Sequence, residues 1–161
     1  MKSNDQIIIL VSTAAVSWWA FHMIKKVLVD TNKEIDLMAR TIWGEARGEG
    51  QLGMQAVANV IMNRVNRGGW WGATISDVVL KPYQFSTWNE SDANRNKARS
   101  VDTSDQAFWT ASKIASMAYN GQLTDVTNGA THYHAKSVTP AWAVGQTPVA
   151  TIGNHVFYKL S

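Results

Sequence analysis

The sequence predicts an α+β fold, a mainly helical domain with a small antiparallel β hairpin near its C-terminus, preceded by an apolar N-terminal helix. Three observations lead to this prediction. Residues 7–24 contain no formal charge. Between residues 34 and 119, three stretches place apolar residues at helical spacing. After residue 125 the pattern changes to short aromatic and β-branched stretches with glycine and proline between them.

Length and composition restrict the class of protein. A chain of 161 residues corresponds to one domain with a real core. Cysteine is absent, which excludes disulfides and thiol chemistry. The net charge of +3 favours polyanionic partners. Lysine and arginine are scattered, however, so we expect no nucleic-acid partner.

The apolar segment at residues 7–24 meets the lower length limit for a transmembrane helix. Serine, threonine and alanine dilute it, whereas Trp18, Trp19 and Phe21 suit a membrane interface. An uncleaved signal-anchor and a core helix both remain open. Lysines flank the segment on both sides, and the pair at residues 25–26 leans weakly toward a cytoplasmic location for the rest of the chain.

The helical region divides into three expected helices, at residues 34–47, 51–66 and 104–119, with a polar linker at residues 30–33. Thr103 and Gln106 have the spacing of a capping box for the third helix. Residues 90–101 are polar and predict a solvent-facing excursion.

The C-terminal region predicts two strands, at residues 131–135 and 151–159, paired as an antiparallel hairpin. Residues 139–142 lie in the connection between them.

Two glutamates stand at the end of the first expected helix of the domain. Glu45 lies at the edge of the apolar face, where partial desolvation should raise its pKa and keep it protonated as a general acid. Glu49 falls between glycines, just past the helix end. The alternative is a surface glutamate that pairs with Arg40 or Arg47.

Two further groups of residues carry side chains suited to binding or catalysis. Residues 83–88 place aromatics beside amides and hydroxyls, which is typical both of sugar contacts and of loop packing. His132, His134 and His155 suggest a metal site, but no carboxylate or cysteine stands at ligand spacing. We therefore favour hydrogen-bonding roles for the histidines and expect no metal and no cofactor.

Three sequence blocks together resemble the SleB/CwlJ-like cell-wall hydrolases. The first is Trp-Gly-Glu-Ala-Arg-Gly-Glu at residues 43–49, followed by residues 55–65. The second is Pro-Tyr-Gln-Phe-Ser at residues 82–86. The third is Ala-Thr-His-Tyr-His-Ala at residues 130–135, with Pro140, Trp142 and residues 152–158.

The resemblance implies a lysozyme-like fold, peptidoglycan glycan strands as the substrate, and Glu45 as the catalytic acid. Glu49 is a possible second acid. The residues expected near the glycan are Gln84, Phe85, Ser86, Tyr133, His134 and Trp142.

The N-terminal segment departs from the spore enzymes of this family. In combination with such a domain it resembles the signal-arrest-release endolysins of phages. This implies a signal-anchor at residues 1–29, a catalytic domain at residues 30–161, and attachment to the host inner membrane through residues 7–24 before release to the periplasm as a monomer.

Two mechanisms remain open for cleavage of the MurNAc–GlcNAc bond. Glycosidases usually need two carboxylates, and the sequence offers Glu45 clearly and Glu49 less clearly. A lytic transglycosylase needs one, because the C6 hydroxyl of the same sugar is the nucleophile. The resemblance favours the transglycosylase over a hydrolytic muramidase. The two non-enzymatic alternatives are a peptidoglycan-binding module and a membrane-anchored scaffold.

Overall fold

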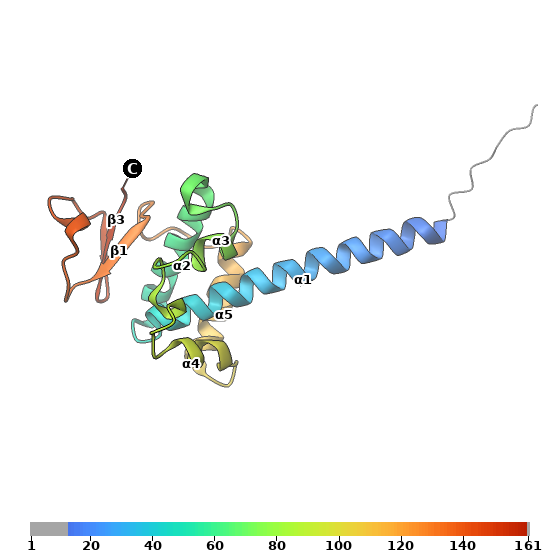
Figure 1. Cartoon of the computed structure of the whole chain (residues 1–161), viewed down its shortest axis with the longest axis horizontal. Coiled ribbons are helices and arrows are strands. Elements are labelled where there is room, and N and C mark those ends of the chain that lie inside the picture. The colour runs from blue at the N-terminus through green and yellow to red at the C-terminus, as the bar shows by residue number, and fades with distance from the viewer. Residues whose placement is uncertain (1–12, 161) are drawn as a thin grey trace, which may run out of the picture. The chain divides into compact units, whose positions relative to one another are not determined.

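The computed structural model describes residues 13–160 and divides into two units, residues 1–32 and residues 33–161. Helix α1 (Thr13–Ala46) runs through the boundary between them (Figure 1). Because the two units are separate bodies, we describe each by itself.

The first unit, where it is described, is the beginning of α1. Its large apolar side chains are exposed: Trp18, Trp19, Phe21, Met23, Ile24, Val27, Leu28 and Val29. Within residues 13–160, no helix combines the length and the apolarity that crossing a membrane requires. The predicted span at residues 7–24 begins outside the described residues.

The predicted linker at residues 30–33 is wrong, because α1 continues through it without a break. None of its four residues is glycine or proline. Polar residues of other types each cost a helix less than about 0.7 kcal/mol. Polarity alone is therefore a weak stop signal, and the helix ends only at Ala46, before the glycines at 48 and 50.

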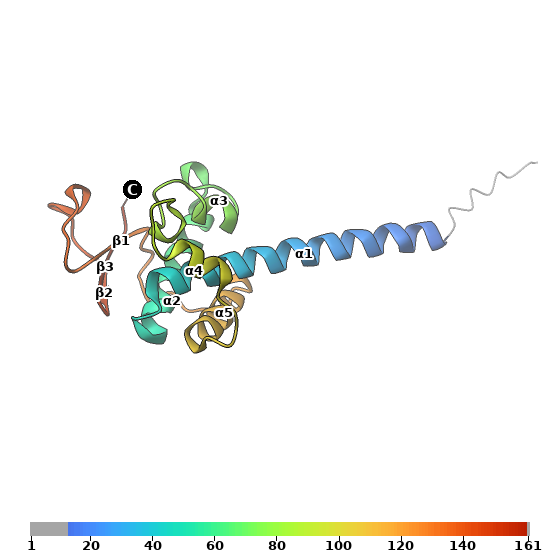
Figure 2. The same cartoon turned by 60° about the horizontal axis from the view of Figure 1, so that its bottom comes forward.

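The second unit is built on helices that surround one apolar core (Figure 2). The elements after α1 are α2 (Gly50–Arg67), η1 (Gly69–Trp71), α3 (Ile75–Val79), η2 (Ser86–Trp88), α4 (Arg95–Ser100) and α5 (Gln106–Tyr119). Met38 and Ile42 of α1, Val57 and Ile61 of α2, and Ile114 of α5 are buried in the same cluster. The expected helices at residues 51–66 and 104–119 are confirmed to within two residues at each end.

The start of α5 differs from the predicted capping box. Asp105, rather than Thr103, is the N-cap, and its carboxylate accepts a hydrogen bond from Phe108 N. The same carboxylate accepts from Trp43 Nε1 at 3.2 Å. The cap therefore also fastens α5 to α1, which a local capping motif does not predict.

The expected solvent-facing excursion at residues 90–101 is wrong in part, because it contains α4 and docks on α1. Ala98 is fully buried. Arg40 Nη1 donates to the carbonyl oxygens of Ala98 at 2.7 Å and Val101 at 3.1 Å.

The C-terminal part forms a three-stranded antiparallel sheet in the order β1-β3-β2. Its strands are β1 (His132–Ala135), β2 (Ala150–Ile152) and β3 (His155–Tyr158), with η3 (Ala141–Ala143) between the first two. The segment expected as one strand at residues 151–159 is therefore a hairpin that turns at Gly153, where φ is +55°. Glycine adopts this conformation at no steric cost.

A second apolar cluster joins the sheet to α2. Ala56 and Val60 of α2 pack with Ala130, Ile152 and Phe157, and all five are buried. Figures 1 and 2 show the sheet beside α2. In the register of β1 and β3, Tyr133 lies opposite Phe157, which fixes Tyr133 relative to the helices.

Candidate active site

Glu45 lies in the last turn of α1, where a glycine lets a second element approach closely. A Cβ added at Gly44 would lie 2.1 Å from Thr87 Oγ1, so a larger residue does not fit. η2 therefore packs directly against α1. Trp88 Nε1 also donates to Thr41 Oγ1 at 2.9 Å, which holds the two elements together.

This close approach supplies donors to one oxygen of Glu45. Oε1 accepts from Thr87 N at 3.0 Å and from Ser86 Oγ at 3.2 Å. The other oxygen, Oε2, accepts from the Tyr133 hydroxyl of β1 at 3.0 Å. The carboxylate is half-buried and held by three donors from two elements distant in sequence. We call Glu45, Ser86, Thr87 and Tyr133 the Glu45 site.

Tyr133 is fixed by the packing of its ring. The ring stacks on Phe157 at 5.6 Å and meets the edge of His155 at 5.0 Å. Burial raises the pKa of Tyr133 well above its usual value, and the negative charge of Glu45 raises it further. The hydroxyl therefore remains protonated and available to Glu45.

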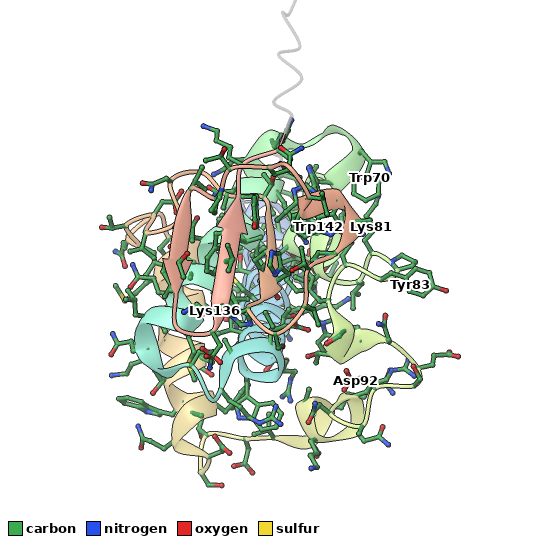
Figure 3. All side chains as sticks on the ribbon, turned by 90° about the vertical axis from the view of Figure 1, so that its left-hand side faces the viewer. Trp70, Lys81, Tyr83, Asp92, Lys136 and Trp142 are labelled. Carbon is green, nitrogen blue, oxygen red and sulfur yellow. The ribbon has the colours of Figure 1, made fainter. Side chains whose placement is uncertain are left out.

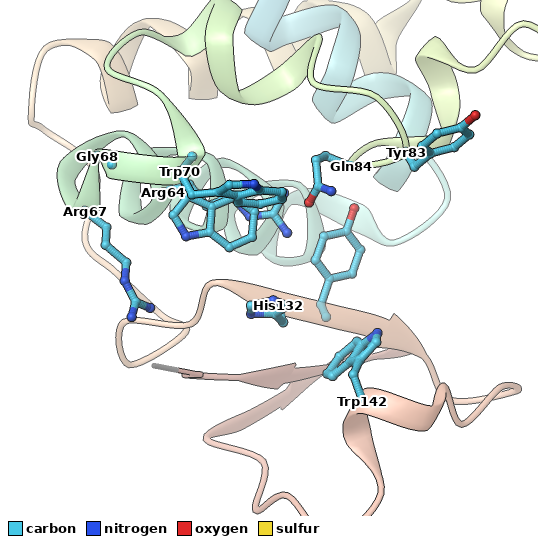
Figure 4. A pocket seen from close by; sticks show the side chains of 11 residues that line it. Arg64, Arg67, Gly68, Trp70, Tyr83, Gln84, His132 and Trp142 are labelled. Carbon is cyan, nitrogen blue, oxygen red and sulfur yellow. The ribbon is translucent and has the colours of Figure 1, made fainter.

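A cleft of about 760 Å³ adjoins the Glu45 site, and Tyr133 belongs to both. We call it the cleft; its lining residues are Arg64, Arg67, Gly68, Gly69, Trp70, Trp71, Tyr83, Gln84, His132, Tyr133 and Trp142. Figure 4 shows Trp70, Arg64 and Gln84 on the helical side and His132 and Trp142 on the side of the sheet. Trp70, Tyr83 and Trp142 are exposed and offer aromatic faces, as sugar rings require.

Tyr83 stands out in backbone conformation. Its φ is +64°, in the left-handed region that residues with a side chain rarely adopt. Its side chain is 87% exposed and projects from the loop, on the same side of the sheet as Trp70 and Trp142 (Figure 3). Such strain is often found at ligand-binding positions.

Arg64 is a buried cation in the wall of the cleft. Its guanidinium lies 4.3 Å above the Trp71 ring and 5.0 Å from the Phe85 ring. Nε donates to Thr131 O at 2.8 Å, while Nη1 is buried without a hydrogen-bond partner. Burial lowers the pKa of Arg64 to about 10, and electrostatic interactions with Tyr133 and Glu45 oppose this effect. Arg64 therefore remains charged beside the Glu45 site at neutral pH.

Glu49 lies apart from the Glu45 site. Its Oε2 accepts from Asn154 N at 2.7 Å and its Oε1 accepts from Asn154 Nδ2 at 3.1 Å, both in the turn between β2 and β3. The backbone hydrogen bond from Asn154 is the main cause of a lowered pKa for Glu49. This carboxylate joins the α1–α2 junction to the sheet.

The other predicted site residues are distributed over four environments. Gln84 and Trp142 line the cleft, and Ser86 contacts Glu45. Phe85 is buried in the core beneath Arg64, because apolar burial takes the ring inward. His134 is not among the lining residues; its ring lies 5.7 Å from that of Trp142, and its Nε2 is 3.1 Å from the Tyr158 hydroxyl.

The pairing of Glu45 with Arg40 or Arg47 is not found. Arg40 Nε donates instead to Asp36 at 2.7 Å, and Arg47 Nη2 donates to Asn94 at 2.8 Å. Among residues 13–160, no group of three or more histidine, aspartate or glutamate side chains is arranged to bind a metal ion.

Sequence analysis missed several residues that the structure brings to the site. Thr87 contributes a backbone N–H, which leaves no trace in the sequence. Arg64 lies within the helix expected at residues 51–66 and Arg67 just beyond it, and neither was assigned a role at the site. Trp70 lies in the glycine-rich stretch at residues 68–72, to which sequence analysis assigned no function, although tryptophan beside glycine in a loop is a usable signal for a binding rim.

Comparison with known proteins adds to this geometry. The family model described as Cell Wall Hydrolase matches residues 48–158, beginning just after Glu45. The chain is 33% identical to the spore cortex-lytic enzyme of Halalkalibacterium halodurans over 128 residues, which are 79% of this chain and 35% of that enzyme. The chain spans less than half the length of such curated relatives.

Two solved structures are similar in fold. The crystal structure of the catalytic domain of the Bacillus cereus SleB protein has a TM-score of 0.64 and 32% identity, covering 80% of this chain and 91% of that domain. The catalytic domain of the germination-specific lytic transglycosylase SleB from Bacillus anthracis has a TM-score of 0.58 and 31% identity, covering 78% and 93%. The chain therefore belongs to the cell wall hydrolase family, in its SleB/CwlJ-like group.

Proposed function

We propose that this chain cleaves the MurNAc–GlcNAc bond of peptidoglycan as a lytic transglycosylase, with Glu45 as the acid and base. One observation carries the proposal: a single glutamate carboxyl, held by three donors, adjoins a cleft whose lining contains no acidic side chain among the described residues. The activity named for the similar Bacillus anthracis domain supports this choice.

The hydrogen bonds of Glu45 suit both steps of the reaction. Thr87 N can only donate, so Oε1 remains an acceptor and Oε2 carries the proton. The hydroxyls of Ser86 and Tyr133 can both donate and accept, so they satisfy the neutral and the ionised carboxyl alike.

In the first step, Glu45 protonates the glycosidic oxygen while the bond from that oxygen to C1 of MurNAc breaks. In the second, the C6 hydroxyl oxygen of the same MurNAc bonds to C1, and its proton returns to Glu45. The product is a 1,6-anhydro ring. Because the nucleophile belongs to the substrate, it has a high effective concentration, and no second carboxylate is needed to activate water.

The first experiment tests the assignment of Glu45. Purified chain is incubated with sacculi, and release of soluble muropeptides is measured for the unmodified chain, Glu45→Gln and Glu90→Gln. We expect E45Q to lose at least about 1,000-fold in rate, because it cannot donate a proton. Glu90 is an exposed glutamate outside the cleft, and E90Q should retain full activity. Comparable release by E45Q would refute the role of Glu45.

The second experiment distinguishes the two chemistries. Mass spectrometry of the released muropeptides identifies anhydro-MurNAc ends, which are one water lighter than reducing ends. Anhydro ends support the transglycosylase, whereas reducing ends that incorporate labelled oxygen from water indicate a muramidase. Binding to sacculi without release of any muropeptide would indicate a non-catalytic module.

We further propose that the chain is an endolysin, held at the inner membrane through residues 7–24 and later released to the periplasm. The exposed apolar side chains of α1, such as Trp18, Trp19 and Phe21, support a membrane contact. Fractionation of expressing cells tests it: the full chain should sediment with membranes, and a variant without residues 1–26 should not. Equal solubility of the two forms would contradict the anchor.

A further inference from the structure

The cleft has an end that the reaction proposed above does not use. Figure 4 shows Arg67 and Gly68 toward one end and Gln84 and Tyr83 toward the other. Gln84 is close in sequence to Ser86 and Thr87, which contact Glu45. The Arg67 end is therefore away from the reacting bond and is open to another part of the substrate.

This end is positively charged. Arg67 lies at this end, Arg64 follows one helical turn away on α2 in the wall of the same cleft, and no acidic side chain of residues 13–160 lines the cleft with them. His132, which also lines the cleft, has a pKa lowered first by burial and then by the charges of both arginines. The arginines in the lining thus place positive potential in this part of the cleft.

The two arginines have capacity to bind an anion. Arg64 is 4% exposed and its Nη1 has no hydrogen-bond partner. Arg67 is exposed, and its Nη1 donates to the backbone oxygen of Leu160. A guanidinium has five N–H donors, so each has donors beyond these contacts. Planar carboxylates match this geometry well.

The cleft also offers aromatic rings on which a sugar can stack. Trp70, which also lines the cleft, is 63% exposed, and Lys81 Nζ lies 4.3 Å from its ring centroid. A sugar ring can stack on such a face while a charged substituent reaches the arginines. Peptidoglycan has this combination, since its muramic acid units bear carboxylate groups.

We propose that the Arg67 end of the cleft is a subsite for a carboxylate borne by a muramic acid unit of the bound strand, away from the cleaved bond. The inference rests on the proposed function in that it takes peptidoglycan as the ligand. Two sources of the carboxylate exist: the stem peptide, and the lactyl group of a unit that has lost its peptide. Both present the same group to the arginines.

The test measures binding, so that it does not depend on cleavage. Chain with E45Q is sedimented at low temperature with native sacculi and with sacculi whose carboxylates have been converted to neutral amides. We expect Arg67→Gln to weaken binding to native sacculi about fivefold and to leave binding to neutralised sacculi unchanged. The matched control Arg99→Gln removes an exposed arginine outside the cleft and should change neither.

Three results would overturn the subsite: no effect of R67Q, an equal effect of R67Q on both sacculi, or an equal effect of R67Q and R99Q. A second measurement avoids any change at Arg67. Neutralising the sacculi should itself weaken binding of the E45Q chain about fivefold and reduce its dependence on salt. Unchanged binding would contradict the proposal even if R67Q failed to fold.

Competition with soluble strands identifies the source of the carboxylate. Glycan stripped of peptides keeps only lactyl carboxylates, whereas intact strands present peptide carboxylates. Stronger competition by intact strands, lost in R67Q, assigns the stem peptide, and stronger competition by stripped strands assigns the lactyl group. If neither form competes in an Arg67-dependent manner, the subsite is excluded, while loss of muropeptide release in E45Q still tests the proposed function separately.

Discussion

Glu45 and Glu49 are the same residue type, four positions apart at the α1–α2 junction, yet they belong to different parts of the molecule. Glu45 accepts hydrogen bonds from η2 and β1 beside the cleft. Glu49 accepts two from Asn154, in the turn between β2 and β3. The difference teaches that the partners from distant elements, rather than the glutamate itself, decide which carboxyl meets the substrate.

After replacement of Glu45 itself, the largest effect should come from separating Glu45 from η2. Gly44→Ala places a methyl group 2.1 Å from Thr87 Oγ1, so η2 must move and its two donors to Glu45 with it. We expect the rate of muropeptide release to fall about 100-fold and stability to fall by about 1–3 kcal/mol.

The matched control for this change is Gly48→Ala. A Cβ at Gly48 meets nothing within 4 Å, so this variant should keep both activity and stability. Urea unfolding and a sacculus assay measure the two quantities. Wild-type behaviour of G44A would mean that close contact with η2 does not matter.

The next effect concerns the donor on the other oxygen. Tyr133→Phe removes the hydroxyl that donates to Glu45 Oε2 and keeps the ring that stacks on Phe157. A hydrogen bond to a charged group contributes about 1.5–3 kcal/mol, so kcat should fall about 10- to 100-fold. The fold should persist, as circular dichroism can verify. A lower affinity with unchanged kcat would instead make Tyr133 a substrate contact alone.

A smaller effect, on stability, is expected from disturbing the contact between Glu49 and the turn at Gly153. Gly153→Ala introduces a Cβ 2.4 Å from Glu49 Oε2 at a position where φ is +55°. Gly121→Ala has a similar φ of +68° with nothing within 4 Å, so it reports the backbone strain alone. We expect G121A to lose about 1–2 kcal/mol of stability and G153A to lose more. Equal losses would show that the contact between Glu49 and the turn contributes nothing.

The smallest effect should be the pH dependence that Glu49 contributes. Its pKa is lowered in the folded chain, mainly by the hydrogen bond from Asn154 N. The stability that Glu49 contributes is therefore fully present above the pKa that Glu49 has in the unfolded chain. It is lost as the pH falls through the lower pKa that Glu49 has in the folded chain. The melting temperature of the unmodified chain should fall more steeply in acid than that of Glu49→Gln. Parallel curves would contradict this assignment.

Much of the fold followed from local pattern, and the exceptions have physical causes. Helices α2 and α5 bury regular apolar faces, which periodicity detects. Sequence analysis did not predict that α1 continues through residues 30–33, because a run of polar residues resembles a linker. The turn at Gly153 was missed because the aromatic and β-branched residues on both sides resemble one strand.

The candidate site was accessible to sequence analysis only in part. Glu45 stood out by its place at the edge of an apolar face. Its partners lie 41 to 88 residues away in sequence, and one of them is a backbone N–H, so no local pattern contains them. Phe85 and Gln84 are neighbours in the chain, but one enters the core and the other lines the cleft, a division that depends on tertiary packing.

The central claim is that Glu45, and not Glu49, exchanges the proton with the glycan. The most direct test compares the initial rate of anhydro-muropeptide formation by Glu45→Gln and Glu49→Gln on the same sacculi. We expect E45Q to be reduced to background and E49Q to stay within about threefold of the unmodified chain, since its carboxyl acts only through the turn. Comparable loss in both variants, or loss in E49Q alone, would contradict the account.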